Sequence, residues 1–403
     1  MIDINLINQC EDQLKEQFSI LEDVALYNQE KVLKAFQNNQ IALRHFSGTT
    51  GYGYDDVGRD TLNKVIADIF KAESAVCSHT IVSGTHALAL SLYGVLRPGD
   101  TMLCVSGKPY DTLYDVIYGK NNGSLEDYGI KFNCINLKND KFDFDAIKNN
   151  LENNPHPKMI YLQRSRGYDW RNALSISAIE ELVKFIRSLG YAGCIMLDNC
   201  YGEFIEKREA IEVGVNLLAG SMIKNIGGGL APTGGYIVGD KKYVDLVLNR
   251  LTAPSISGEV GSYSYGYQYF YQGIFLAPHV VLQALKGSML FGLVLSKLGY
   301  ETSPSVNELP GDIIRAIKFN NEKDLISFIQ SIQKNSPIDS FVDALPWEMP
   351  GYQDKIIMAA GCFVQGSSIE LSADAPIKQP YIAYMQGGLT YEHLKIALKN
   401  LNL

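Results

Sequence analysis

The stretches Ile195-Met196-Leu197-Asp198-Asn199 and Ser221-Met222-Ile223-Lys224-Asn225 decide the fold class of this chain. The first is an apolar run that ends in an aspartate, and a lysine follows 224 − 198 = 26 positions later. A carboxylate at the carboxyl end of a buried strand points into the crevice where α/β proteins bind ligands. The two stretches therefore predict a mostly parallel sheet with a ligand site at its carboxyl edge.

A third stretch, Ser83-Gly84-Thr85-His86-Ala87, precedes a helical pattern and places hydroxyl and N–H donors where phosphate is favoured. Pyridoxal phosphate needs an amine for a Schiff base, a carboxylate for its pyridine nitrogen and donors for its phosphate. Taken singly, Lys224 reads as a surface lysine, Asp198 as a turn cap and Ser83 to Thr85 as a helix start. Their combination and order favour a pyridoxal phosphate site, for which the pKa of Lys224 would have to be lowered.

Other polar side chains follow predicted strands at the same edge. Tyr110 can stack on a flat ring, with a half-buried loop tyrosine as the alternative. Ser221 offers a further hydroxyl to a phosphate. Arg164 and Arg166 can grip a carboxylate in bidentate fashion, although a structural salt bridge explains either arginine equally well. The alternating tyrosines from Tyr263 to Tyr271 indicate a subunit interface, a site lining or core packing.

The bulk properties exclude several classes of protein. The chain has 403 residues, 46% of them hydrophobic, and a formal net charge of −8. This length predicts more than one core, and the acidic balance argues against nucleic acid and membrane partners and for a small-molecule substrate. The start of the chain lacks a cationic, apolar leader, so a cytoplasmic protein is expected. Seven widely spaced cysteines without a CxxC pair predict reduced thiols and no metal site.

Apolar runs alternate with helical patterns from about residue 60 to residue 239, which is typical of crossover units in a parallel sheet. The predicted strands are Thr101 to Ser106, Lys131 to Leu137, Met159 to Gln163, Cys194 to Asp198, Val215 to Ser221 and Tyr236 to Val238. The predicted helices between them are Ala87 to Leu96, Thr112 to Gly119, Phe144 to Leu151 and Ser177 to Leu189.

The flanking parts have other patterns. A polar helix is expected from Gln9 to Asn38, and an apolar helix from Val280 to about Leu298. Strands Ile313 to Phe319 and Ser367 to Leu371 around helix Glu322 to Lys334 predict a smaller α+β domain. We therefore divide the chain into an N-terminal helix and arm (1–59), a large cofactor-binding domain (60–290) and a small C-terminal domain (291–403).

Several motifs resemble those of the aluminium resistance protein family, whose members are similar to cystathionine β-lyase and methionine γ-lyase. The likeness spans almost the whole chain and is carried by Thr50-Gly51-Tyr52-Gly53-Tyr54-Asp55-Asp56-Val57-Gly58-Arg59-Asp60-Thr61-Leu62, Ser83-Gly84-Thr85-His86-Ala87, Gly227-Gly228-Gly229-Leu230-Ala231-Pro232-Thr233-Gly234-Gly235 and Tyr384-Met385-Gln386-Gly387-Gly388-Leu389-Thr390. The resemblance implies the α/β fold of the type I pyridoxal phosphate enzymes.

The same resemblance implies roles for individual residues. Lys224 would bind the cofactor, Asp198 would pair with its pyridine nitrogen and Tyr110 would stack on its ring. Its phosphate would meet Ser83, Gly84, Thr85 and Ser221. Tyr54 and Arg59 would reach the phosphate of a partner subunit, which implies a homodimer or homotetramer with shared active sites.

The chain departs from the lyases at two positions. Ile223 stands where they carry a phosphate-binding threonine, and Glu370 stands where they place the arginine that holds the substrate carboxylate. Because Glu370 reverses that charge, we expect Arg164, Arg166 or Lys378 to hold the carboxylate instead. A substrate that is not an ordinary α-amino acid is the alternative.

These observations predict a pyridoxal phosphate-dependent carbon–sulfur lyase that acts on a sulfur-containing amino acid by β- or γ-elimination. Lys224 would be its general base. An aminotransferase or another lyase is a second hypothesis, because the fold hosts them all. A pyridoxal phosphate-binding, non-catalytic protein of stress resistance is a third, and Glu370 motivates it.

Overall fold

Seven strands form the large sheet of the computed structural model, which describes residues 1–403. The strand order is β1-β7-β6-β5-β4-β2-β3, and only β7 runs antiparallel to its neighbours. The strands are β1 Ser74–Ser78, β2 Thr101–Cys104, β3 Lys131–Cys134, β4 Met159–Gln163, β5 Cys194–Asp198, β6 Leu217–Ser221 and β7 Gly235–Gly239. The predicted, mostly parallel sheet of an α/β protein is confirmed, and β1 is a strand that the sequence patterns did not indicate.

Helices cover both faces of this sheet, so its central strands are buried on both sides and appear in the sequence as continuous apolar runs. Met196 packs on one face in a cluster with Leu88 of α4 (Gly84–Val95) and Val244 of α8 (Lys241–Leu251). Its neighbour Leu197 packs on the other face with Leu182 of α7 (Ile176–Ser188). The remaining helices of this part are α3 Val57–Phe70, α5 Tyr114–Tyr118 and α6 Phe144–Asn153.

The smaller sheet has five strands in the order β10-β11-β12-β9-β8, all antiparallel. Its elements are β8 Glu301–Ser303, β9 Ile314–Phe319, β10 Ile356–Ala359, β11 Ser372–Pro376 and β12 Tyr381–Gln386, with helices α10 Glu322–Lys334 and α11 Tyr391–Lys399. A separate α+β domain at the C-terminus is thereby confirmed.

The prediction of a strand from Ser367 to Leu371 is wrong, because β11 begins only at Ser372. The Glu370 carboxylate accepts hydrogen bonds from the backbone N–H groups of Phe363 and Val364, at 2.9 and 3.0 Å. These bonds hold the chain in a compact turn just before the strand, where an extended conformation had been expected.

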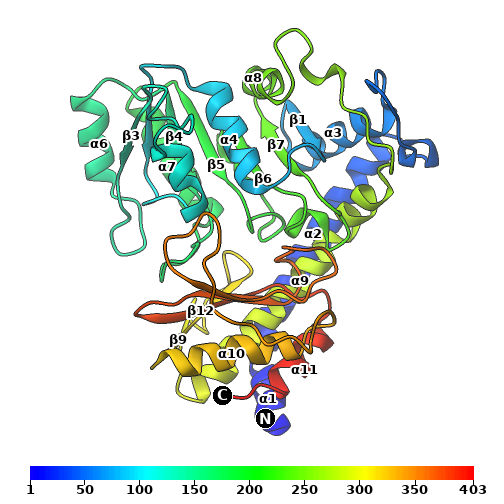
Figure 1. Cartoon of the computed structure of the whole chain (residues 1–403), viewed down its shortest axis with the longest axis vertical. Helices are drawn as coiled ribbons and strands as arrows, with labels where there is room; N and C mark the ends of the chain where they lie inside the picture. Colours follow the sequence, from blue (N-terminus) through cyan, green and yellow to red (C-terminus); the bar gives the residue numbers. More distant parts are fainter.

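Long helices connect the two sheets, which lie one above the other in Figure 1. The single polar helix predicted at the N-terminus is two helices, α1 Ile4–Gln13 and α2 Lys15–Asn38. Helix α9, Gln268–Lys297, begins 280 − 268 = 12 residues before the predicted apolar helix. It is long and apolar enough to span a membrane, but 67% of its apolar window is buried, which fits a core helix.

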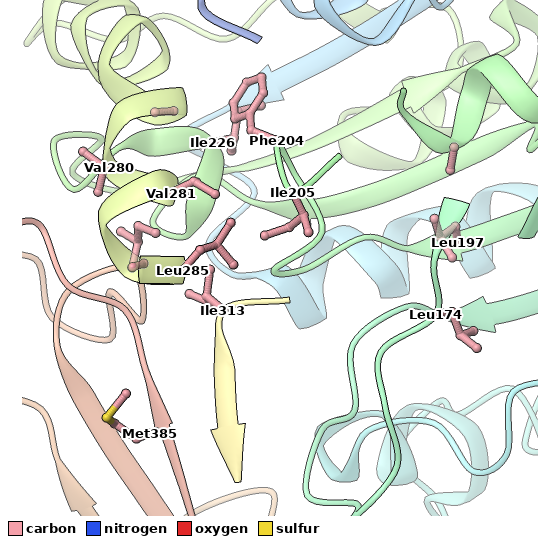
Figure 2. Packing of buried hydrophobic residues seen from close by; sticks show 14 of the residues in the cluster. Leu174, Leu197, Phe204, Ile205, Ile226, Val280, Val281, Leu285, Ile313 and Met385 are labelled. Atoms are coloured by element: carbon pink, nitrogen blue, oxygen red, sulfur yellow. The ribbon is translucent and has the colours of Figure 1, made fainter. Parts of the chain in front are cut away.

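The core continues between the two sheets along α9. Figure 2 shows Val281 and Leu285 of this helix pointing toward Ile205 of the large domain and Ile313 at the start of β9. Both termini lie at the far end of the small domain, where the Ile2 N–H donates to the Lys399 carbonyl at 2.9 Å. The three-part division of the chain stays a prediction, and α9 crosses the proposed boundary at residue 290.

Candidate active site

Asp198 and Lys224 come from neighbouring strands and lie at the same edge of the large sheet. Asp198 is the last residue of β5, is 5% exposed, and accepts a hydrogen bond from the Cys200 N–H at 3.1 Å. Burial raises its pKa, whereas the Cys200 N–H and the Lys224 ammonium lower it, and the net direction is upward. Parallel pairing of β5 with β6 brings Lys224, three residues past Ser221, to this aspartate.

The Lys224 side chain is partly buried, and its Nζ lies 4.2 Å from the centre of the Tyr201 ring. Burial disfavours the ammonium, but the neighbouring Cys200, Tyr201 and Asp198 side chains outweigh it and raise the pKa of Lys224. The sequence argument had required a lowered pKa. Cys200 and Tyr201 stabilise the ammonium of the lysine, and so does Asp198, the carboxylate that would serve a pyridine nitrogen.

The predicted phosphate cradle is assembled beside these two residues. Ser83 caps α4, and its hydroxyl accepts the His86 N–H at 3.0 Å. The first N–H groups of this 12-residue helix have no partner within the helix and carry its positive dipole end. A Cβ on Gly84 would lie 3.3 Å from Cys200 Sγ and 3.5 Å from Ser221 Cβ. Gly84 and Ser221 therefore lie side by side, in a cradle whose donors suit a phosphate.

Tyr110 lies in a group of tyrosines between the two domains. Its N–H donates to Gln163 Oε1 at 2.6 Å, and its hydroxyl lies 2.8 Å from that of Tyr352. The ring meets Tyr168 edge-on at a centroid distance of 5.6 Å, and Tyr168 in turn lies 5.1 Å from Tyr384. Burial raises the pKa of Tyr110 well above its ordinary value, so this hydroxyl stays protonated at neutral pH.

Arg164 serves the protein structure. Its side chain has no exposed surface. The guanidinium donates to Asn199 Oδ1 at 3.2 Å, to the Gly202 carbonyl at 2.7 Å, to the Leu174 carbonyl at 3.3 Å and to Glu206 Oε1 at 2.9 Å. These bonds hold the loop that follows Asp198. A substrate carboxylate would have to displace them, so the structure does not favour Arg164 for that task.

Arg166 is placed differently, although it is only 2% exposed. Its Nη1 donates to Ser303 Oγ at 2.9 Å, and its buried Nε has no partner. The residue lines a cavity of about 440 Å³ together with Tyr110, Tyr168 and Lys378. Lys378 is half exposed, and its Nζ is paired with Asp354 at 2.6 Å. Of the three predicted carboxylate ligands, Arg166 is the one that lines the same cavity as Tyr110 and has a side-chain donor without a partner.

Glu370 does not face this cavity. Both of its carboxylate oxygens accept backbone N–H groups of the 363–364 turn, and burial raises its pKa. It lines a separate cavity of about 220 Å³ with Phe363 and His393. The charge reversal inferred at this position therefore has a structural role in the turn.

Tyr54 and Arg59 lie apart from the cradle. Tyr54 is 63% exposed, whereas Arg59 is buried and donates to Asp60 Oδ1 at 2.8 Å and to the Gly53 carbonyl at 3.0 Å. Their loop is joined to the alternating tyrosines, because Tyr267 donates to the buried Asp56 at 2.8 Å. Those tyrosines form no strand, and their exposure ranges from 89% at Tyr265 to 1% at Tyr271.

The sequence patterns did not indicate several residues of the site. Tyr201 and Glu203 lie in the loop after Asp198, Tyr352 comes from the small domain, and Asp374 is a buried carboxylate on β11. Tyr201 follows Asp198 by three positions, and this closeness in sequence was the only signal that could have placed it in the site. The others depend on contacts between distant segments.

The chain is similar to known proteins over almost its whole length. Residues 3–402 match the model of a family described as methionine gamma-lyase. A Bacillus subtilis (strain 168) protein, named uncharacterized protein YnbB, is 47% identical over 382 residues, which are 94% of this chain and 90% of the relative. A solved Clostridium novyi NT structure, described as a carbon-sulfur lyase involved in aluminum resistance, is 46% identical, covers 99% of this chain and 94% of its own, and has a TM-score of 0.95.

A more distant structure shows the fold alone. It is an Escherichia coli protein described as pyridoxal-5'-phosphate dependent, 16% identical with a TM-score of 0.63, and the match covers 94% of this chain and 96% of that one. The architecture of the type I pyridoxal phosphate enzymes is thereby shown.

Proposed function

The chain belongs to the methionine γ-lyase family, and from this premise we propose that it is a pyridoxal phosphate-dependent carbon–sulfur lyase acting on a sulfur-containing amino acid. The observation that carries the proposal is the convergence of Asp198, Lys224 and the α4 N-terminus at one edge of the large sheet. Carboxylate, amine and anion cradle are the three groups that this cofactor requires.

The proposed cofactor fits the residues present. Ser83, Gly84, Thr85 and Ser221 would hold its phosphate, and Asp198 would face its pyridine nitrogen. When bound, the cofactor supplies an electron sink for negative charge at the substrate α-carbon. A cationic pyridine nitrogen beside Asp198 would balance the charge that otherwise raises the pKa of Lys224.

Three side chains of the protein would then remove the proton, hold the cofactor ring and bind the substrate. Lys224 Nζ takes the α-proton as general base. Tyr110 would stack on the ring of the cofactor, and Gln163 and Tyr352 hold this tyrosine in place. Arg166 would receive the α-carboxylate, because it lines the cavity beside Tyr110 and its Nε has no protein partner. We further propose a cytoplasmic homodimer or homotetramer, in which the exposed Tyr54 and the neighbouring Arg59 reach a partner subunit's cofactor phosphate.

The first test is the visible absorption of wild type and Lys224→Ala after incubation with pyridoxal phosphate and then borohydride. We expect a lysine-bound band in wild type alone, fixed covalently by borohydride. A band of equal strength in Lys224→Ala contradicts the assignment of Lys224. Absence of a band in wild type rejects the cofactor and the enzyme with it.

The second test measures the products formed from cystathionine and methionine. Release of thiol, 2-oxo acid and ammonia in equal amounts supports elimination. Amino transfer to an added 2-oxo acid, without thiol release, identifies the aminotransferase alternative instead. Arg166→Gln should raise KM about 10- to 100-fold, as expected for a lost charged hydrogen bond, and should destabilise the fold by only about 1 kcal/mol, through the lost bond to Ser303.

A further inference from the structure

One face of the small sheet turns polar side chains toward the large domain. Asp374 on β11 pairs in register with Tyr384 on β12, and Ser372 pairs with Gln386. Residues two positions apart share a strand face, so these four side chains lie on the same side of the sheet. Tyr384 packs there against Tyr168 of the large domain. This face is therefore directed at the candidate active site.

Asp374 differs from its neighbours on this face because few groups pair with its carboxylate. The residue is 9% exposed, and its Oδ1 is buried without a partner. Its Oδ2 accepts only a long hydrogen bond, 3.5 Å, from Gln386 Nε2. The hydroxyl of Ser372 is also buried and unpartnered, and the Tyr168 hydroxyl makes no hydrogen bond of normal geometry although it lies close enough to Asp374 to lower its pKa. A buried carboxylate is costly unless it is paired, so its placement points to a ligand.

The surroundings of Asp374 suit a cation. Tyr168 lies next to it on the side of the large domain, with ring centroids 5.1 Å from Tyr384, 5.9 Å from Tyr352 and 5.6 Å from Tyr110. Aromatic rings around a carboxylate are a common way to recognise an ammonium group, since ring faces attract cations.

Lys224 is the cation that this protein itself brings near Asp374. Burial raises the pKa of Asp374 to about 7, and the Tyr168 and Gln386 side chains and the Lys224 ammonium hold it from rising further. In the proposed enzyme Lys224 is committed to the cofactor, and Arg166 to the α-carboxylate of the substrate. The carboxyl group of Asp374 then has no cationic side chain of the protein left to pair with it.

We propose that Asp374 and the tyrosines around it form a subsite for a primary ammonium on the leaving group of the substrate. The inference rests on the proposed lyase function and narrows its substrate to S-substituted amino acids whose departing thiol carries an amine. The α-amine of the substrate is needed at the cofactor, so the subsite receives a second amine. A thioether with an apolar end, such as methionine, leaves the carboxylate unpaired and is disfavoured.

The test compares two amino acids of nearly equal shape, S-(2-aminoethyl)-L-cysteine and S-propyl-L-cysteine, with the cofactor-loaded protein. We expect kcat/KM to favour the aminoethyl compound by about 10- to 100-fold, the worth of a charge-assisted hydrogen bond. Asp374→Asn should reduce that preference to near one by slowing only the aminoethyl compound. Asp343→Asn removes an exposed carboxylate of the same domain and should keep the preference.

Equal use of both compounds by wild type, or an equal loss on both in Asp374→Asn, overturns the subsite. If wild type cleaves neither compound while holding its cofactor, the lyase proposal fails for this class. Calorimetry with tetramethylammonium, which cannot react with the cofactor, then decides the subsite separately. Binding to wild type that is lost in Asp374→Asn supports a cation site, and no binding to wild type rejects it.

Discussion

Replacing Glu203 by glutamine tests whether this buried carboxyl group, which lies behind the active site, lacks a compensating partner. Glu203 has no exposed surface. Its Oε1 accepts the Tyr236 hydroxyl at 2.6 Å, whereas its Oε2 is buried without a partner. Burial raises its pKa to about 8 from an ordinary value of 4.5. Its backbone carbonyl also accepts the side-chain amide of Asn225, next to Lys224, at 3.1 Å.

The sign of the effect follows from the raised pKa. Between pH 4.5 and 8 the folded protein keeps a proton on Glu203 that the unfolded chain has lost, so stability falls as the pH rises. Each tenfold change in proton affinity is worth about 1.4 kcal/mol, which makes the whole loss about 5 kcal/mol. About 4 kcal/mol of it falls between pH 5 and pH 9.

Glutamine does not titrate, so the unfolding temperature of Glu203→Gln should increase relative to that of wild type as the pH rises. An unfolding entropy near 2.1 cal/mol/K per residue converts about 4 kcal/mol into about 5 °C for this chain. The assay is thermal unfolding of both proteins at pH 5 and pH 9, with equal pyridoxal phosphate.

The control is Glu180→Gln. Arg208 and Lys184 lower the pKa of Glu180 to about 2, so its contribution is already complete at pH 5 and the variant should show a constant offset. If the difference between Glu203→Gln and wild type is the same at pH 5 and pH 9, the carboxyl group titrates normally and the argument from burial is refuted.

Other predictions concern single contacts. Arg164→Lys should destabilise the protein by about 1–3 kcal/mol, since it leaves the carbonyl groups of Leu174 and Gly202 without their donors; an unchanged unfolding temperature would show that these bonds are dispensable. Glu370→Ala should speed hydrogen exchange at the Phe363 and Val364 amides, measured by mass spectrometry, and protection equal to wild type would contradict the capping role. Mixing inactive Lys224→Ala with a Tyr54→Ala variant should restore part of the activity if sites are shared between subunits, whereas no recovery after confirmed subunit exchange speaks against sharing.

The large sheet and the main residues at its carboxyl edge could be predicted from local sequence patterns. An apolar run before Asp198 and a helix start at Ser83 are local patterns, because burial on both faces and helix capping each act over a few residues. Parallel strands share a carboxyl edge, so the meeting of Asp198 and Lys224 also followed from the sequence. The small domain was foreseen as α+β, although one of its strands was placed too early.

The roles of the polar residues depend on contacts that form only in the folded protein. Arg164 and Arg166 are two positions apart and look alike in sequence. The guanidinium of Arg164 is hydrogen-bonded to carbonyl and carboxylate groups, whereas Arg166 lines a cavity and keeps one donor without a partner. Asp374 and Tyr168 are about half the chain apart and meet only because the small sheet packs on the large domain. Hydrogen bonding and desolvation depend on the neighbours in space, and those neighbours come from segments whose contact no local pattern records.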